Sequence, residues 1–313
     1  CFFSDNLVSS KMSELPSFFL VGAAKSGTTS LWLYLRQHPE IFFPKNKEPN
    51  YFAYAGRSDL NFPGPAEPET IRNKLHPLTI TQNEKYRALF QGVSEKAVGE
   101  ASVRYLYFPR ACERIAASLP DAKIIIMLRN PIDRLYSHFL MMKGMYRLEP
   151  LSLPEALVRE DERIAANWDW DWHYVHVSMY FEQVRRYIDH FGDANVRVYI
   201  YEDFCRNPLD VIRQIFQFLE VDPTFVPDMT RRGMEGYWPK SFTIDGLLRS
   251  PASANTLTKI FPRAIHNKII RYGMRLNKGK APAMPGSVRL QLQELFQRDV
   301  TRLEQLLEKK LPW

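Results

Sequence analysis

A short stretch near the start of the chain combines a lysine, glycines and several hydroxyl side chains. The apolar run Phe18–Val21 predicts a buried strand, and the pattern over Thr28–Gln37 predicts a helix. Where a glycine-bearing loop opens a helix, backbone N–H groups and the helix dipole converge, so this stretch predicts an anion site. The residues that we expect to bind the anion are Lys25, Ser26, Gly27, Thr28, Thr29 and Ser30.

This loop differs from an ATP-binding P-loop at one position. Gly22 and Gly27 fit the G-x-x-x-x-G spacing, but Thr28 stands where that motif has its lysine. The lysine of this loop, Lys25, lies between the glycines instead. This displacement argues against a kinase or NTPase, which stays an alternative only with a variant loop. A non-catalytic phosphate-binding module ranks behind it, because Lys25 and a possible base, Glu48, are both present.

A second candidate anion site follows the apolar run Lys123–Leu128. Arg129 comes at the carboxyl end of that predicted strand, which is where ligands bind in open parallel sheets. Pro131 suits the first turn of the next helix, and Ser137 lies about two turns further along it. An arginine and a hydroxyl in these places can bind one phosphate through charge-assisted hydrogen bonds.

Two glutamates are candidates for a general base, the group that removes a proton from an acceptor. Glu48 follows the short run Ile41–Phe43, and Glu100 follows the run Ala97–Val98. A salt bridge to a neighbouring lysine is the structural alternative for Glu48. A purely structural role is the alternative for Glu100.

The bulk composition narrows the class of protein and its partners. The chain has 313 residues, 45% of them hydrophobic, which is typical of a soluble globular protein with ample core. Its net charge of +7 favours anionic partners, and a phosphorylated cofactor accounts for that charge without nucleic acid. Cys1, Cys112 and Cys205 are too widely spaced for a zinc knuckle or disulfide framework, which favours a cytoplasmic location. No apolar run reaches the ~20 residues of a membrane span, so we expect no membrane partner. No acidic metal-binding motif accompanies the loop, so we expect no metal.

Strand-like runs alternate with helical patterns, which predicts an α/β fold with a P-loop-like central parallel sheet flanked by helices. The expected strands cover Phe18–Val21, Ile41–Phe43, Ala97–Val98, Lys123–Leu128 and Val196–Tyr201. The expected helices cover Thr28–Gln37, Pro109–Ser118, Ile132–Met142, Leu153–Ala165, Ser178–His190, Pro208–Leu219 and Ser287–Lys310. We expect one domain over residues 16–313 after an N-terminal extension at 1–15, with irregular flaps or lids near 54–80 and 221–286.

Together, the two anion sites resemble the two cofactor motifs of the sulfotransferase family, whose members use 3′-phosphoadenosine 5′-phosphosulfate (PAPS) and release PAP. Residues 25–30 are similar to the 5′-phosphosulfate loop, and Arg129 with Ser137 is similar to the 3′-phosphate pair. Other segments that resemble bacterial and glycan-type members lie at residues 38–41, 47–52, 99–106 and 201–204. The resemblance implies a single sulfotransferase domain that transfers sulfonate without a required metal.

The resemblance also implies catalytic roles. Lys25 would bond the bridging oxygen and stabilise the leaving group, and Glu48 aligns with the catalytic glutamate of glycan sulfotransferases. Glu100 is the second candidate base. Some glycan enzymes carry a lysine directly after the glutamate that matches Glu100, whereas this chain has Ala101 there. Cytosolic members use a histidine instead, so a histidine base stays open.

Two further groups of residues complete the expected site. In many members a basic, glycine-containing loop late in the chain adds to the 3′-phosphate site, and the matching residues here are Lys278, Gly279 and Lys280. An aromatic cluster at residues 168–176 is a candidate wall of the acceptor pocket, with a core patch as the alternative. The side chains that we assign to that pocket are Arg104, His173 and His176.

The acceptor is the least determined part of the sequence-based prediction. The first choice is a hydroxyl on a small molecule or on a carrier-bound acyl chain, as in sulfotransferase domains of polyketide and olefin synthases. That choice implies an acyl carrier protein as a partner. Because the chain does not begin with methionine, we expect a segment of a larger protein. The alternative acceptor is an oligosaccharide hydroxyl or amine.

Overall fold

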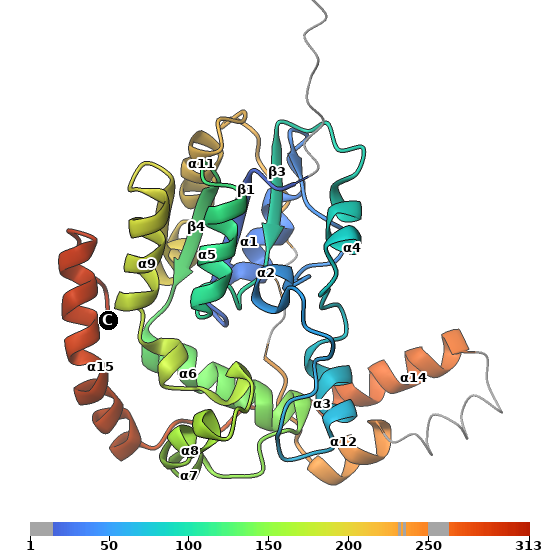
Figure 1. The fold of residues 1–313 in the computed structure, drawn as a ribbon. Coiled ribbons are helices and arrows are strands. Elements are labelled where there is room, and N and C mark those ends of the chain that lie inside the picture. The colour runs from blue at the N-terminus through green and yellow to red at the C-terminus, as the bar shows by residue number, and fades with distance from the viewer. Residues whose placement is uncertain (1–14, 231–232, 234–235, 250–262) are drawn as a thin grey trace, which may run out of the picture.

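The computed structural model describes residues 15–230, 233, 236–249 and 263–313, so the expected N-terminal extension lies almost wholly outside the described residues. Five parallel strands form one sheet in the order β2-β3-β1-β4-β5 (Figure 1). Their bounds are β1 (Phe18–Gly22), β2 (Ile41–Phe42), β3 (Ala97–Ala101), β4 (Lys123–Leu128) and β5 (Val196–Ile200). The predicted α/β fold with a parallel sheet is therefore confirmed.

Helices cover both faces of the sheet, because alternate residues of each buried strand point to opposite sides. In β1, Phe19 and Val21 pack into the layer with α5 and α9, and Phe18 and Leu20 pack into the layer with α1 and α11. Figure 1 shows α5 and α9 in front of the strands. The helices around the sheet are α1 (Thr28–Leu35), α5 (Pro109–Ser118), α9 (Phe181–Phe191), α10 (Tyr201–Arg206), α11 (Pro208–Phe218) and α15 (Gly286–Leu306).

Most expected elements begin and end within four residues of the observed ones, and one expected helix is divided in two. The run expected as a strand to Tyr201 ends one residue earlier, and Tyr201 begins α10. The helix expected over Leu153–Ala165 is two helices, α7 (Leu153–Val158) and α8 (Glu160–Ala165). The Glu160 side chain explains part of this difference, because it turns inward to accept hydrogen bonds from the backbone N–H groups of Val175 and His176.

The two regions expected to be irregular contain helices. Residues 54–80 include α3 (Pro68–Leu75), which begins with proline at a position where the missing N–H costs nothing. Residues 221–286 include α12 (Phe242–Arg249) and α14 (Arg263–Leu276), while residues 231–232, 234–235 and 250–262 lie outside the described residues. The remaining helices are α2 (Tyr51–Tyr54), α4 (Asn83–Arg87) and α6 (Pro131–Leu140), which continues as a π-helix over Met141–Tyr146.

The topology places the candidate residues at one edge of the sheet. β1 lies between β3 and β4, so the chain segments that follow these three strands leave the sheet side by side. The loop with Lys25 follows β1, Arg104 follows β3, and Arg129 follows β4. This is the edge where open parallel sheets bind their ligands.

Candidate active site

The loop after β1 has a backbone that only a few residue types adopt easily. Gly27 caps α1 with a φ of 79°, and a Cβ added there would lie 2.7 Å from ring atoms of Tyr201. Lys25 has a φ of 67°, and Glu48 has a φ of 65°. Non-glycine residues in this left-handed region cost about 1–3 kcal/mol each and are concentrated at functional sites. Both candidate catalytic side chains therefore project from unusual backbone positions.

A cavity with a volume of about 410 Å³ lies where this loop meets the ends of the strands. It brings together most of the residues predicted from the sequence, which come from the segments that follow β1, β2, β3 and β4. Of the predicted residues, those lining the cavity are Lys25, Gly27, Thr28, Thr29, Ser30, Glu48, Arg104, Arg129 and Ser137. Ser26 belongs to the same loop but is fully buried.

Lys25 is a cation held among other cations. The pKa of its ammonium group is lowered to about 8, chiefly by burial and next by Arg129, while Glu48 partly opposes the effect. Its Nζ lies 3.5 Å from Sδ of Met141. Anions that bind here would relieve the repulsion between Lys25 and Arg129, so the cavity favours a negatively charged ligand.

Two contacts hold the guanidinium of Arg129 in place. Its Nη1 donates to the carbonyl of Lys25 over 3.1 Å, and its guanidinium lies 4.9 Å from the centre of the Tyr201 ring. The next residue, Asn130, caps α6 by accepting the N–H groups of Ile132 and Asp133 at 3.0 and 3.2 Å. Because the cap fixes the start of α6, Ser137 faces the cavity two turns later, together with Arg129.

Glu48 lies at the same cavity and forms an ion pair with its neighbour. Its Oε1 is 2.6 Å from Nζ of Lys47, and that amine is also 3.5 Å from Oγ1 of Thr28. Burial would raise the pKa of Glu48, but Lys47, Arg104 and Lys25 outweigh burial and lower it. Glu48 is therefore ionised at neutral pH, as a proton acceptor must be.

Lys47, expected from the sequence only as a salt-bridge partner of Glu48, is a further cation at this site. Its contact with Thr28 places it at the start of α1, next to the anion loop.

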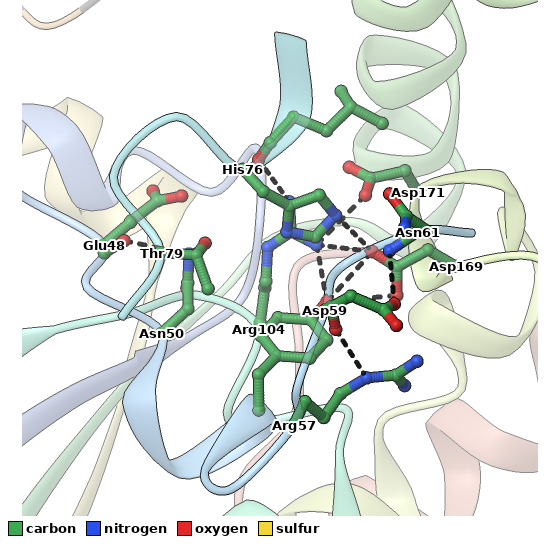
Figure 2. Close-up of polar contacts among 12 residues, drawn as sticks. Glu48, Asn50, Arg57, Asp59, Asn61, His76, Thr79, Arg104, Asp169 and Asp171 are labelled. Carbon is green, nitrogen blue, oxygen red and sulfur yellow. Dashed lines mark hydrogen bonds and ion pairs between the residues drawn. The ribbon is translucent and has the colours of Figure 1, made fainter. Parts of the chain in front are cut away.

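Two hydrogen bonds hold the backbone of Glu48 in place. The N–H of Glu48 donates to the carbonyl of Ala101 over 2.9 Å. Its own carbonyl accepts from Nδ2 of Asn50, as Figure 2 shows.

Glu100, the second candidate base, lies on β3 but is not among the residues that line the cavity. Its Oε2 accepts hydrogen bonds from the hydroxyls of Tyr86 at 2.9 Å and Tyr105 at 2.8 Å. Full burial raises the pKa of Glu100 to about 7. Glu100 therefore lies outside the lining of the cavity that Lys25 and Glu48 share.

Arg104 lines the cavity from the centre of a buried polar cluster (Figure 2). Its Nη1 donates to Asp169 over 2.8 Å, to Asp171 over 3.1 Å and to the Tyr54 hydroxyl over 2.8 Å. His76, Asp169 and Asp171 each offer one atom of a kind that can bind a metal ion, and these three atoms all lie within 4.8 Å of one another. The guanidinium already supplies a positive charge between the two carboxylates.

The aromatic cluster contributes to the cavity through residues other than the two histidines. Trp170 and Asp171 line it, whereas His173 and His176 do not. His173 is buried against Tyr107, with Nδ1 2.9 Å from the hydroxyl. Nδ1 of His176 lies 2.8 Å from Glu160, in a half-exposed position. The expectation that these histidines line the acceptor pocket therefore has no support in the geometry.

The late basic loop lies beside Ser137, one of the two residues expected to bind a 3′-phosphate. Gly279 lines a small cavity of about 110 Å³ together with Lys25 and Ser137. The N–H of Gly279 donates to the carbonyl of Trp238 over 2.7 Å, which fixes the loop. Lys278 and Lys280 are exposed on either side of it.

The geometry agrees with comparisons to known proteins. A family model described as "Sulfotransferase family" matches residues 16–225, which is more than half of the chain. The chain belongs to the sulfotransferase family. Its fold resembles the crystal structure of a sulfotransferase from Alicyclobacillus acidocaldarius, with 36% identity and a TM-score of 0.71. That similarity covers 95% of this chain and 97% of the other.

Curated relatives of this sulfotransferase are longer proteins. The membrane-associated sulfotransferase kil1 of Dictyostelium discoideum is 30% identical over 132 residues, or 42% of this chain and 24% of the relative. Mouse carbohydrate sulfotransferase 15 is 23% identical over 248 residues, or 67% of this chain and 44% of the relative. The chain thus spans less than half the length of these relatives.

Proposed function

We propose that this sulfotransferase moves a sulfonate group from PAPS to an acceptor hydroxyl, with Lys25 and Glu48 as catalytic residues. One observation carries the proposal. Lys25, Glu48 and the pair Arg129 and Ser137 come from three separate chain segments, and all four residues line the same cavity. Two anion-binding elements and an ionised carboxylate in one cavity suit the transfer of a charged group from a bisphosphorylated donor.

The donor set of the cavity fits PAPS. Lys25 and the hydroxyl and backbone groups of residues 26–30 would bind the 5′-phosphosulfate, because they surround the N-terminus of α1. Arg129 and Ser137 would bind the 3′-phosphate, and the residue 278–280 loop would border it. When bound, PAPS supplies the sulfonate group and leaves as PAP.

Lys25 and Glu48 would then have separate roles, one in stabilising the leaving group and the other in removing a proton. The ammonium group of Lys25 would stabilise negative charge that develops on the leaving phosphate oxygen. The Glu48 carboxylate would accept the proton of the acceptor hydroxyl as the new oxygen–sulfur bond forms. Lys47 would hold Glu48 in place through their 2.6 Å ion pair.

The remaining walls of the cavity favour an acceptor with an apolar body. Leu75, Val103, Tyr146 and Trp170 line it beside the phosphate-binding residues. These walls support a hydroxyl on a small molecule or an acyl chain as the acceptor. An acyl carrier protein would be the partner if the chain is carrier-bound.

A glycan is the second candidate acceptor, and the comparisons favour it. Relatives named carbohydrate sulfotransferase 15 and heparan sulfate N-deacetylase/N-sulfotransferase match about two thirds or more of this chain, each at 23% identity. Arg104 and Asp171 would supply polar contacts to sugar hydroxyls in that case.

The test combines an acceptor screen with one substitution. Purified protein and PAPS would be incubated with hydroxyacyl-pantetheine thioesters, simple alcohols or neutral oligosaccharides, and sulfated products would be identified by mass spectrometry. We expect Glu48→Gln to lower turnover about 10²–10⁴-fold while PAP affinity stays within a few fold. Glu69→Gln is the matched control, because the Glu69 side chain is 76% exposed on α3. An unchanged rate for Glu48→Gln would remove Glu48 from the mechanism.

A further inference from the structure

Helix α14 carries a stripe of large apolar side chains that face solvent. Ile265 is 44% exposed, Ile269 39%, Tyr272 64% and Leu276 59%. Their spacing of four, three and four residues places them within an arc of about 60° around the helix. A continuous apolar stripe on one exposed helix face marks an interaction surface more strongly than scattered apolar residues do.

The side of α14 next to this stripe already has a partner within the chain. α14 packs on α12, and a Cβ added at Gly273 would lie 2.9 Å from the side chain of Leu248. Asn277, at the end of the helix, is buried and exchanges hydrogen bonds with the backbone of Ser241. Around the helix, Gly273 and Asn277 lie about 70–110° from the centre of the apolar stripe, so the stripe borders the packed side and stays exposed. In Figure 1, α14 extends away from the sheet at the right of the view.

The segment that contains α14 is strongly basic. Residues 263–280 contain six lysines and arginines and no aspartate or glutamate. Lys268, Arg271 and Arg275 are exposed, and their spacing places them on a stripe directly beside the apolar one. An apolar stripe next to a basic stripe is typical of a helix that lies in the interface of an anionic membrane.

We propose that α14 binds the surface of a membrane rich in anionic phospholipid. Ile265, Ile269, Tyr272 and Leu276 would enter the boundary between headgroups and acyl chains, and Lys268, Arg271 and Arg275 would contact lipid phosphates. No helix among the described residues is long and apolar enough to span a bilayer. A helix that lies in the interface does not need to span the bilayer. The proposal therefore departs from the sequence-based expectation of no membrane partner, which rested on the lack of a spanning run.

The position of α14 would bring the catalytic cavity close to the membrane. Leu276 ends the helix, and Gly279, three residues later, lines the small cavity beside Ser137. The proposal is independent of the acceptor assigned above, and it concerns residues outside the segment that the family model matches.

The test is co-sedimentation of the full chain with vesicles. We expect binding to phosphatidylcholine vesicles that contain one third phosphatidylglycerol, with little binding to pure phosphatidylcholine. Arg271→Gln combined with Arg275→Gln should weaken binding about 25-fold, since each basic residue contributes about fivefold near an anionic surface. Ile269→Glu should abolish binding. PAP affinity should stay unchanged in these variants, which shows that they are folded.

The matched control is Leu290→Glu on α15, because Leu290 is 64% exposed and lies outside the stripe. It should bind vesicles like the parent protein. Equal binding of the parent to neutral and anionic vesicles, or no binding to either, would overturn the proposal. A dimer in lipid-free solution that Ile269→Glu dissociates, without vesicle binding, would assign the stripe to a second copy instead.

Discussion

Removing the charge of Lys25 should stabilise the ligand-free protein while it destroys activity. The pKa of this amine falls from 10.5 to about 8 because of burial and the nearby Arg129. This change corresponds to at most about 3 kcal/mol of unfavourable free energy in the folded state at pH 7. Because Lys25 lines an open cavity, solvent screening makes the true value smaller. Lys25→Met should recover part of this free energy.

The pH dependence gives this prediction a specific signature. Between pH 8 and 10.5 the unfolded state binds more protons at Lys25 than the folded state does, so stability rises with pH there. Below pH 8 the full cost is present in the parent protein. The advantage of Lys25→Met should therefore be about 3 kcal/mol or less at pH 7 and about 1 kcal/mol at pH 9.5.

Urea unfolding of the ligand-free protein at these two pH values would measure the effect. Lys45→Met is the matched control, since Lys45 is exposed on the segment before Glu48 and should show no pH-dependent gain. A Lys25→Met variant that is no more stable than the parent at pH 7, or whose difference does not change with pH, would refute the reasoning. Turnover of the same variant should fall by orders of magnitude.

Three other substitutions test separate parts of the site. Arg129→Met should weaken PAP binding by about 2–3 kcal/mol and abolish the preference for PAP over AMP in calorimetry, because one charge-assisted phosphate contact is lost. Glu100→Gln should remove a pH dependence of folding stability. Burial raises the pKa of Glu100 to about 7, so the free energy of unfolding of the parent protein should fall by about 3 kcal/mol as pH rises from 4.5 to 7. Arg104→Met should destabilise the protein by about 3–5 kcal/mol in urea unfolding, because two buried carboxylates lose their shared cation; an unchanged midpoint would contradict the role of the cluster.

The sequence predicted those elements whose signals are local. The run Lys123–Leu128 is continuously apolar and became β4 with the expected bounds, since a central parallel strand is buried on both faces. Pro109 and Pro208 each start a helix where expected, because proline fits the first helical turn. The break between α7 and α8 was not predicted, because the Glu160 contacts near it involve residues 15 and 16 positions away.

The site was predictable in its phosphate-binding part and less so in its acceptor part. Loop chemistry and strand ends identify Lys25 and Arg129 without knowledge of the fold. Tyr201, Trp170 and Asp171 reach the cavity only through tertiary packing, and no spacing rule in the chain indicates them. The aromatic cluster was noticed, but periodicity does not show which of its members face a cavity.

The central claim is that the cavity binds the bisphosphate nucleotide of a sulfotransferase and not ATP. Calorimetric titration of the purified protein with PAP in the absence of magnesium, beside ATP with magnesium, tests it most directly. The account predicts binding of PAP that does not depend on magnesium, and much weaker binding of ATP. A preference for ATP with magnesium would contradict the assignment of Lys25, Arg129 and Ser137 to one PAPS site.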